Sequence, residues 1–494
     1  MSVVIEALAA WQKRTPDAIA LCDSTRVVQY GELADRVGET ASVLEAHGSR
    51  CVALLADNSI DWIIADLAAL QAGITMIPLP PFFSDTQLQH LLASAPIDTL
   101  LADDAARVAG VAAGFEPRRG RVGGLEMFCR DRSLVPPYEA SISVAKITFT
   151  SGSTGQPKGV CLARAGLEQT AQGLAAALSD LGIRRHLCVM PLATLLENIA
   201  GVYAPILLGA SIRVLPLREV GITGSSRLNV AVLRHAIGKT GAESVILLPQ
   251  VLQDLTSEVS ERPWPGCPLK FVAVGGARIS DQDVEDADAA GIPVFQGYGL
   301  SECNSVVALN RPSASRNGSV GKPLPGISIR IAADGEIIVS GSCMIGYLGD
   351  EPVSGGELAT GDLGRLDVDG FLYVTGRKKS MFITSFGRNV SPEWPEAELM
   401  HQPEIAQAVV FGEARAFNTA VLVPADPGTG PRQLAAAVAR ANGKLPDYAR
   451  IAEWIIVCEP FTTANGLLTP SGKPRREAVI LRHILDPEPV ALQA

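Results

Sequence analysis

Small hydroxylated residues, glycines and a lysine follow an apolar segment of this sequence. The stretch reads Ile147-Thr-Phe-Thr-Ser-Gly-Ser-Thr-Gly-Gln-Pro-Lys-Gly-Val160, so an expected strand runs directly into residues 150–158. Glycines leave backbone N–H groups open to a phosphate, hydroxyl groups add donors, and Lys158 supplies a movable positive charge. Two residues separate Gly155 from Lys158, which excludes a Walker A loop. The stretch predicts a phosphate-binding loop, because a plain linker would need neither the strand nor the lysine.

Four further segments carry residue types that suit a nucleotide. They offer an aromatic ring with a carboxylate, a lone aspartate, a basic cluster and a lysine near the C-terminus. In chain order they are Gln296-Gly-Tyr-Gly-Leu-Ser-Glu302, Thr360-Gly-Asp362, Gly376-Arg-Lys-Lys379 and Asn465-Gly-Leu-Leu-Thr-Pro-Ser-Gly-Lys473.

Together and in this order, the five segments resemble the signature motifs of the adenylate-forming superfamily. This group includes acyl-CoA synthetases, nonribosomal-peptide adenylation domains and firefly luciferase, and the chain is most similar to AMP-forming fatty-acyl-CoA synthetases. The resemblance runs from about residue 10 to residue 485. It implies an enzyme that joins a carboxylic acid to the α-phosphate of ATP and then passes the acyl group to a thiol.

The resemblance also implies a role for each motif. The first reaction brings two anions together, so its catalysis is mainly charge neutralisation and positioning. Lys158 and its loop would hold the β- and γ-phosphates, and Glu302 would ligate Mg²⁺, a hard cation that prefers oxygen. Lys473 would stabilise the transition state, which makes Lys473, Glu302 and Lys158 the predicted catalytic residues. The predicted ATP-binding residues are Thr150, Ser151, Gly152, Ser153, Thr154, Gly155, Lys158, Gly276, Gln296, Gly297, Tyr298, Gly299, Ser301, Asp362, Arg377 and Lys473.

Within that set, the resemblance places Tyr298 against the adenine and Asp362 on the ribose hydroxyl groups. A carboxylate can accept from two adjacent OH groups. Arg377 would reach the ribose or the phosphates. Taken alone, Asp362 would be a turn residue and Lys473 part of a basic tail, so both roles depend on the motifs.

The second reaction needs a thiol in the same cleft, either coenzyme A or the phosphopantetheine of a carrier protein. By resemblance, a small C-terminal domain of residues 377–494 swings against a large domain of residues 1–376, with a hinge near Lys379. Gly387-Arg388-Asn389 follows where this group often lines the thiol tunnel, although Arg388 could equally be a surface cation.

The acid-binding pocket is expected near Met190-Pro-Leu-Ala-Thr-Leu-Leu-Glu-Asn198. Many acyl-CoA synthetases carry a histidine or an aromatic residue where this chain has Thr194, and Asn198 is a candidate substitute. Glu197 could meet a cationic substrate or serve as a charge at a helix N-terminus. Since this segment has no acidic residue before Glu197, a simple amino acid is not expected as substrate. The predicted pocket residues are Thr194, Asn198, Gly275, Ala277 and Gly297.

Up to about residue 375, segments with helical periodicity alternate with apolar segments. These elements must position the motifs. Residues 61–71 and 167–178 read as helices, whereas residues 74–79, 186–191, 211–215, 244–249, 271–275 and 293–297 read as buried strands. This alternation predicts an α/β fold with parallel strands, whose binding sites lie beyond the carboxyl ends of the strands.

The sequence pattern changes near Ser315. From there, short segments with turns at Asp334-Gly335 and Asp369-Gly370 favour antiparallel strands. The predicted architecture is a large region of two parallel-rich α/β subdomains with a small β subdomain. A small, mobile α+β C-terminal domain follows it.

The composition narrows the class of protein. The 494 residues include 42 basic and 52 acidic side chains, and the net charge of −10 argues against a protein that wraps nucleic acid. The longest uncharged run, residues 67–84, is broken by prolines and a glycine, so no membrane span is predicted. Nine cysteines without a C-x-x-C pair indicate reduced thiols rather than a disulfide framework or a zinc site. The expected location is the cytoplasm.

The resemblance and the motifs together predict an AMP-forming acyl-CoA synthetase of fatty-acid metabolism that uses ATP, Mg²⁺ and coenzyme A. Its substrate would be a fatty or aryl acid. An alternative is a ligase that loads an acyl- or peptidyl-carrier protein. A non-catalytic nucleotide-binding relative is disfavoured, because Lys158, Glu302, Asp362 and Lys473 occur together.

Overall fold

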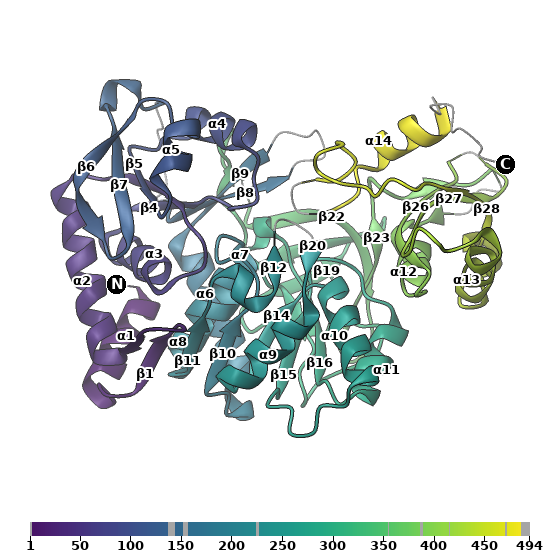
Figure 1. The fold of residues 1–494 in the computed structure, drawn as a ribbon, viewed down its shortest axis with the longest axis horizontal. Helices are drawn as coiled ribbons and strands as arrows, with labels where there is room; N and C mark the ends of the chain where they lie inside the picture. The colour runs from purple at the N-terminus through teal and green to yellow at the C-terminus, as the bar shows by residue number, and fades with distance from the viewer. Residues whose placement is uncertain are drawn as a thin grey trace.

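A computed structural model describes residues 2–136, 144–151, 157–223, 227–353, 355–385, 389–413, 415–469 and 472–485. Figure 1 shows a large region of sheets and helices and, at one side, a smaller region that carries the C-terminus. The predicted fold class, α/β with a separate small C-terminal part, is confirmed. None of the helices in the described ranges is long and apolar enough to cross a membrane.

The first large sheet has nine strands among the described residues, and its centre is parallel. The predicted strands at residues 186–191, 211–215, 244–249, 271–275 and 293–297 are all found here; the first four are slightly shorter than expected, and the last is shifted by one residue. Parallel pairing runs from β1 through β11, β10, β14 and β15 to β16. In sheet order the strands are β18 (Lys322–Pro323), β17 (Ala308–Leu309), β16 (Val294–Tyr298), β15 (Phe271–Val274), β14 (Ser244–Leu247), β10 (Arg185–Cys188), β11 (Ser211–Val214), β1 (Ile19–Cys22) and β2 (Val27–Gln29).

A second large sheet is mixed, with eight strands in the part of the chain that the structure describes. Its parallel core is β8, β4, β3 and β5, and antiparallel strands flank it on both sides. In sheet order the strands are β21 (Gly346–Tyr347), β9 (Pro157–Leu162), β8 (Lys146–Ser151), β4 (Thr75–Pro78), β3 (Cys51–Leu55), β5 (Thr99–Ala102), β7 (Leu125–Arg130) and β6 (Phe115–Val122).

Helices cover both sheets and bury one continuous core between them. The predicted helix at residues 61–71 is observed as α3, which is almost entirely buried and ends at Gly73 in the left-handed conformation (φ 68°). The helices of the large region are α1 (Val3–Arg14), α2 (Tyr30–Ala46), α3 (Ile60–Ala72), α4 (Asp85–Ser94), α5 (Ala105–Val111), α6 (Arg164–Leu178), α7 (Leu195–Asn198), α8 (Ala204–Leu208), α9 (Val230–Thr240), α10 (Pro249–Glu261) and α11 (Asp281–Ala289).

A small antiparallel sheet follows, as the sequence pattern beyond Ser315 predicts. Its order is β19 (Ser328–Ile331), β20 (Glu336–Ser340), β22 (Glu357–Leu366) and β23 (Leu372–Arg377). Short hairpin pairs are β12 (Ile222–Thr223) with β13 (Arg227–Leu228), and β24 (Phe382–Ile383) with β25 (Asn389–Val390).

The C-terminal region has its own core around a small mixed sheet. Strand β27 (Asn418–Pro424) pairs antiparallel with β26 (Ile405–Phe411) and parallel with β28 (Ile451–Ile456). The helices of this region are α12 (Glu393–Met400), α13 (Pro431–Gly443) and α14 (Arg476–Ile480).

A buried ionic cluster stands at the start of the strand that leads to the predicted phosphate loop. The Lys146 ammonium at the start of β8 donates to Asp66 Oδ1 at 2.7 Å and also contacts Asn198. Tyr203 Oη and Asn198 Nδ2 each donate to Asp66 Oδ2 at 2.9 Å. Both charged side chains are at most 2% exposed, so each depends on the other for compensation. Burial lowers the pKa of Lys146, while Asp66 opposes that change.

Substitution of Lys146 by Met should therefore destabilise the large region by about 3–5 kcal/mol, because Asp66 is left buried without its cation. Denaturant unfolding measures this loss, and Lys146→Met combined with Asp66→Asn should recover part of it. Lys239→Met is the matched control: Lys239 is exposed on α9, and a change within about 0.5 kcal/mol is expected. A loss below about 1 kcal/mol for Lys146→Met would contradict this reading of the cluster.

Candidate active site

The predicted phosphate loop leaves the second large sheet between β8 and β9. These strands pair antiparallel, and their register places Thr150 directly opposite Lys158. The predicted residues Gly152, Ser153, Thr154 and Gly155 lie outside the described residues, as does the Ser151 side chain. Lys158 is exposed, and its Nζ lies 5.2 Å from the centre of the Tyr347 ring. A cation over an aromatic face is attracted to it.

Glu302 stands next to the same tyrosine. Tyr347 Oη donates to Glu302 Oε1 at 2.9 Å, so one side chain contacts both the predicted phosphate lysine and the predicted metal ligand. Burial and the Glu302 carboxylate raise the pKa of Tyr347 to about 12, which keeps its hydroxyl a donor. Tyr347 is on β21, which pairs with β9, so the sheet brings together residues 158 and 347.

The turn that carries Glu302 has an unusual backbone. Strand β16 ends at Tyr298, a 3₁₀ turn covers Ser301–Cys303, and Asn304 and Ser305 then adopt positive φ angles of 56° and 96°. Such conformations are disfavoured for residues other than glycine and concentrate at functional sites. A Cβ atom on Gly299 would lie 1.6 Å from the Ser305 carbonyl oxygen, so only glycine fits this close approach.

Asp362 forms the second centre of charge. It lies in β22, not in a turn, and the register of β22 with β23 pairs it directly with Arg377. Arg377 Nε donates to Asp362 Oδ1 at 2.7 Å, and Tyr298 Oη donates to Asp362 Oδ2 at 2.7 Å. Burial alone would lower the pKa of Arg377, but the Asp362 carboxylate raises it. Burial and Asp362 together raise the pKa of Tyr298 far above its usual range.

Lys473 reaches this centre from the C-terminal region. Its backbone closes a tight loop, in which Lys473 N donates to Thr469 Oγ1 at 3.0 Å and Thr469 N donates to Lys473 O at 2.7 Å. The Lys473 residue is exposed, but desolvation by the surrounding protein lowers the pKa of its side chain, and the Arg377 charge lowers it further. The carboxylates of Asp362, Glu302 and Glu393 oppose this shift, so the ammonium lies within electrostatic range of both centres.

A buried ion pair anchors the Lys473 loop. Arg476 contacts both oxygens of Glu396 on α12 and donates to Val410 O at 2.9 Å. Glu396 also accepts from Val410 N at 2.6 Å, which joins α12, β26 and the start of α14. Arg476, three residues after Lys473, therefore ties the loop to the C-terminal core.

The predicted acid-pocket residues divide into two groups. Gly275 and Gly297 are neighbours at the ends of β15 and β16: a Cβ atom on Gly275 would lie 3.5 Å from Gly297 O and 4.0 Å from Leu196 Cδ2, whereas one on Gly297 would lie 3.2 Å from Leu309 Cδ1. Ala277 is exposed close by, and Thr194 donates its hydroxyl to Pro191 O at 2.7 Å. Asn198 differs from expectation, because its amide is bonded to Lys146 and Asp66 inside the core.

Glu197 requires a correction. The possibility that it meets a cationic substrate is wrong, because its side chain is fully buried. It lies in the first turn of α7, contacts His186 Nε2 at 3.0 Å and accepts from Met190 N at 3.0 Å. His186, Cys188 and Glu197 form a cluster that the sequence reasoning missed. The available signal was the spacing of two between His186 and Cys188, which places both on one face of β10.

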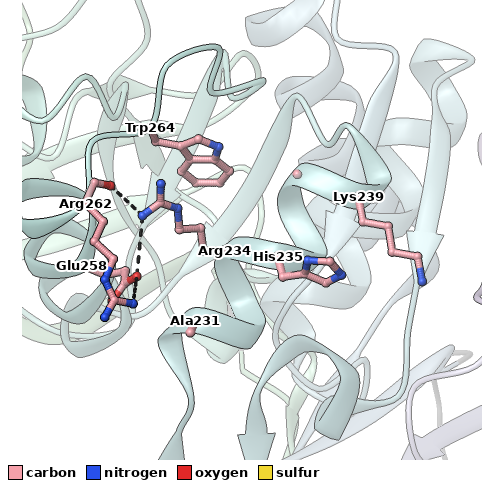
Figure 2. A pocket seen from close by; sticks show the side chains of 8 residues that line it. Ala231, Arg234, His235, Lys239, Glu258, Arg262 and Trp264 are labelled. Carbon is pink, nitrogen blue, oxygen red and sulfur yellow. Dashed lines mark hydrogen bonds and ion pairs between the residues drawn. The ribbon is translucent and has the colours of Figure 1, made fainter.

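A shallow groove lies on the outer surface between α9 and α10, and it contains none of the predicted site residues (Figure 2). Arg234 crosses it, with its guanidinium 5.2 Å from the Trp264 ring centre and hydrogen-bonded to the carbonyls of Arg262 and Pro263. The lining residues are Ala231, Arg234, His235, Gly238, Lys239, Glu258, Arg262 and Trp264.

Comparison with known proteins identifies the family. Residues 8–348 match the model of AMP-binding enzymes, and residues 379–483 match the model of the AMP-binding enzyme C-terminal domain. The chain belongs to the AMP-binding enzyme family. The predicted membership of the adenylate-forming group, and of its acyl-CoA synthetase type, is thereby confirmed.

Three relatives indicate the range of the family around this chain. A long-chain-fatty-acid–CoA ligase (FadD15) of Mycobacterium bovis is 28% identical over 94% of this chain and 92% of its own length. The 2-succinylbenzoate–CoA ligase of Geobacillus kaustophilus is 30% identical over 81% of this chain and 82% of its own. The solved O-succinylbenzoate CoA synthetase (MenE) of Bacillus subtilis with ATP and magnesium ion has a TM-score of 0.74 at 25% identity, and the match covers 95% of this chain and 98% of that one.

Substitution of Gly299 by Ala should weaken AMP binding about tenfold or more while the protein stays folded. The added Cβ forces the turn between Tyr298 and Glu302 to move, and losing one hydrogen bond to a charged group costs about 1.5–3 kcal/mol. Isothermal titration calorimetry measures the affinity. Gly443→Ala at the end of α13 is the control, because a Cβ there meets nothing within 4 Å. Equal affinities for both variants would show that the turn does not shape the nucleotide site.

Proposed function

We propose that the chain is an AMP-forming acid–CoA ligase that acts on a fatty or aryl carboxylic acid. The observation that carries this proposal is the arrangement of Lys158 and Glu302 around Tyr347 and of Arg377 beside Asp362. Lys473 lies within electrostatic range of both carboxylates. The CoA-ligase relatives support the same reaction.

In the first step the carboxylate of the acid attacks the α-phosphorus of ATP, and pyrophosphate leaves. Lys158 and the 150–155 loop hold the β- and γ-phosphates, and Lys473 offsets the charge that builds as the two anions meet. Tyr298 lies against the adenine, and Asp362, oriented by Arg377, accepts hydrogen bonds from the ribose. Five further residues would line the same nucleotide site: Gly276, Gln296, Gly297, Gly299 and Ser301.

The side chains present fit a magnesium ion at Glu302. The site offers a hard carboxylate oxygen beside Lys158, where phosphates would complete the coordination, and the Tyr347 hydroxyl orients the carboxylate. When bound, the ion would neutralise phosphate charge. Glu302 and Tyr347 hold that position.

In the second step the thiol of coenzyme A attacks the acyl carbon, and AMP leaves. We propose that residues 377–494 form a mobile domain that turns near Lys379 to admit the thiol. The exposed side chain of Lys379, next to a Lys378 that is held by Asp334 at 2.6 Å and Glu336 at 2.9 Å, supports a hinge at this point. Of the expected thiol-tunnel residues, Gly387 and Arg388 lie outside the described residues, as does the Asn389 side chain.

The acid would bind beside Gly275, Gly297 and Ala277, at the ends of β15 and β16. Leu196 lies next to Gly275, and Thr194 turns its hydroxyl to the backbone, which favours an apolar chain or ring. The relatives take a long-chain fatty acid or succinylbenzoate, as their names state. None of the nine cysteines forms a disulfide, which favours a reducing compartment and hence the cytoplasm.

Pyrophosphate exchange over a panel of fatty and aryl acids tests the first step and the substrate together. Mass spectrometry with coenzyme A, or with a carrier protein that bears a free phosphopantetheine thiol, identifies the acceptor. Exchange without thioester formation on coenzyme A, but with transfer to a carrier, would overturn the choice of acceptor. No exchange with any acid of the panel would overturn the proposed substrate class.

Lys473→Ala should reduce pyrophosphate exchange by about 10²-fold or more, because the transition state loses a positioned charge. Transfer from a preformed acyl-adenylate to coenzyme A should be nearly unchanged. Arg475→Ala is the control, because this exposed neighbour lies outside the predicted site. Full exchange by Lys473→Ala would refute the assignment of this lysine.

The Lys379→Pro variant should show the opposite effect to Lys473→Ala on the two steps. A fixed backbone φ at the hinge restricts the domain rotation, so acyl-adenylate should form while thioester formation is blocked. Lys239→Ala, on the distant α9, controls for the loss of a surface charge. Thioester formation at the wild-type rate would show that the hinge lies elsewhere.

A further inference from the structure

A second contact between the two regions lies away from the nucleotide site, where α11 faces α12 (Figure 1). His401, directly after α12, places Nδ1 2.7 Å from Asp283 Oδ1 and Nε2 3.8 Å from Asp286 Oδ2, both on α11. Lys444 Nζ donates to Gln282 Oε1 at 3.3 Å, and the Arg278 guanidinium lies 5.7 Å from the Trp394 ring centre. Residues 278–286 of the large region thus meet residues 394–444 of the C-terminal region.

Asp283 is preorganised for this contact. It belongs to the capping box of α11, in which its Oδ2 accepts from the Ser280 hydroxyl at 2.7 Å and its own N–H donates to that hydroxyl at 3.1 Å. Gln253 Nε2 donates to Oδ1 at 3.0 Å. The carboxylate is only 5% exposed, so its remaining hydrogen-bonding capacity points at His401.

The contact and the position of Lys473 occur in the same arrangement of the two regions. His401 and Lys473 both belong to the C-terminal region, whereas Asp283, Asp362 and Glu302 belong to the large region. The arrangement that brings His401 to Asp283 is therefore the one that brings Lys473 within range of Asp362 and Glu302. A rotation that moves Lys473 out of the cleft would also separate His401 from α11.

We propose that His401 and Asp283 form a latch that holds the C-terminal region in the orientation for acyl-adenylate formation. His401 is then a positioning residue, which acts through Lys473. The proposal rests on the two-step function proposed above, since a latch matters only where the second step needs another orientation.

The latch should be sensitive to pH because its histidine titrates. The hydrogen bond and the negative charge of Asp283 raise the pKa of His401, and Asp286 and Glu398 add to the effect. Burial would raise the pKa of Asp283, but His401 and Ser280 lower it overall, so this carboxylate stays charged near neutral pH. The other charged groups near this interface are Asp281, Arg278 and Lys444.

The direction of the pH dependence follows from the raised pKa of His401. A histidine whose pKa is raised by docking stabilises the docked state fully below its ordinary pKa of about 6.5. That stabilisation is lost as the pH rises through the raised pKa. The orientation for the first step should therefore be most populated at mildly acidic pH and decline toward alkaline pH.

The test separates the two half-reactions between pH 6 and pH 9. Pyrophosphate exchange reports the first step, and single-turnover transfer from preformed acyl-adenylate to coenzyme A reports the second. In the wild type, the ratio of exchange to transfer should fall as the pH rises. In His401→Ala this ratio should be about tenfold below the wild-type ratio at pH 6, because a hydrogen bond to a charged group is lost. The two ratios should converge toward pH 9, so the difference between the enzymes reports the latch. Asp283→Asn should behave alike, since asparagine can still cap α11.

His401→Gln keeps a neutral donor and should recover part of the ratio without its pH dependence. His235→Ala is the matched control, because this exposed histidine lies in the α9 groove (Figure 2) and should leave both rates unchanged. If wild-type and His401→Ala enzymes show the same ratio at every pH while exchange proceeds, the latch is refuted. If the wild type gives no exchange with any acid, the proposed function fails instead.

Discussion

The carboxylate of Asp362 is the point on which the arrangement of the site depends. It accepts from Arg377 across the β22–β23 ladder and from Tyr298 at the end of β16, so it joins the small antiparallel sheet to the first large sheet. A buried carboxylate needs such partners, because desolvation of an unpaired charge costs several kcal/mol. The same two bonds orient an aromatic ring and a guanidinium toward one cleft.

Tyr347 has a similar function for the second large sheet. Its hydroxyl holds Glu302 and its ring faces the Lys158 ammonium, so a single side chain fixes the distance between an anion and a cation at the phosphate end of the site. The strained turn at Asn304 and Ser305 is retained at this point, where Gly299 permits the backbone approach. Each end of the nucleotide would thus meet side chains that protein contacts already orient.

The C-terminal region completes the site from a different core. Arg476 ties the segment after Lys473 to that core through its ion pair with Glu396. The contacts from that core to the large region include the pair of His401 with Asp283 and a lysine–glutamine hydrogen bond. This difference fits the mobile C-terminal domain proposed above, because a polar interface with the large region can open at low cost.

Much of this could be read from the amino-acid sequence. The phosphate-loop motif, the order of the five motifs and the alternation of helices with apolar strands determined the family and the fold class, because each depends on residues close together in the chain. Tertiary structure alone decided which distant side chains meet. Tyr347 joins Lys158 to Glu302 because β21 pairs with β9 across nearly 190 residues, Asn198 turns into the core toward Lys146, and His186 pairs with the buried Glu197. Strand pairing and burial depend on contacts between segments far apart in the chain, and no local pattern of residue types records which partner each strand or buried charge will find.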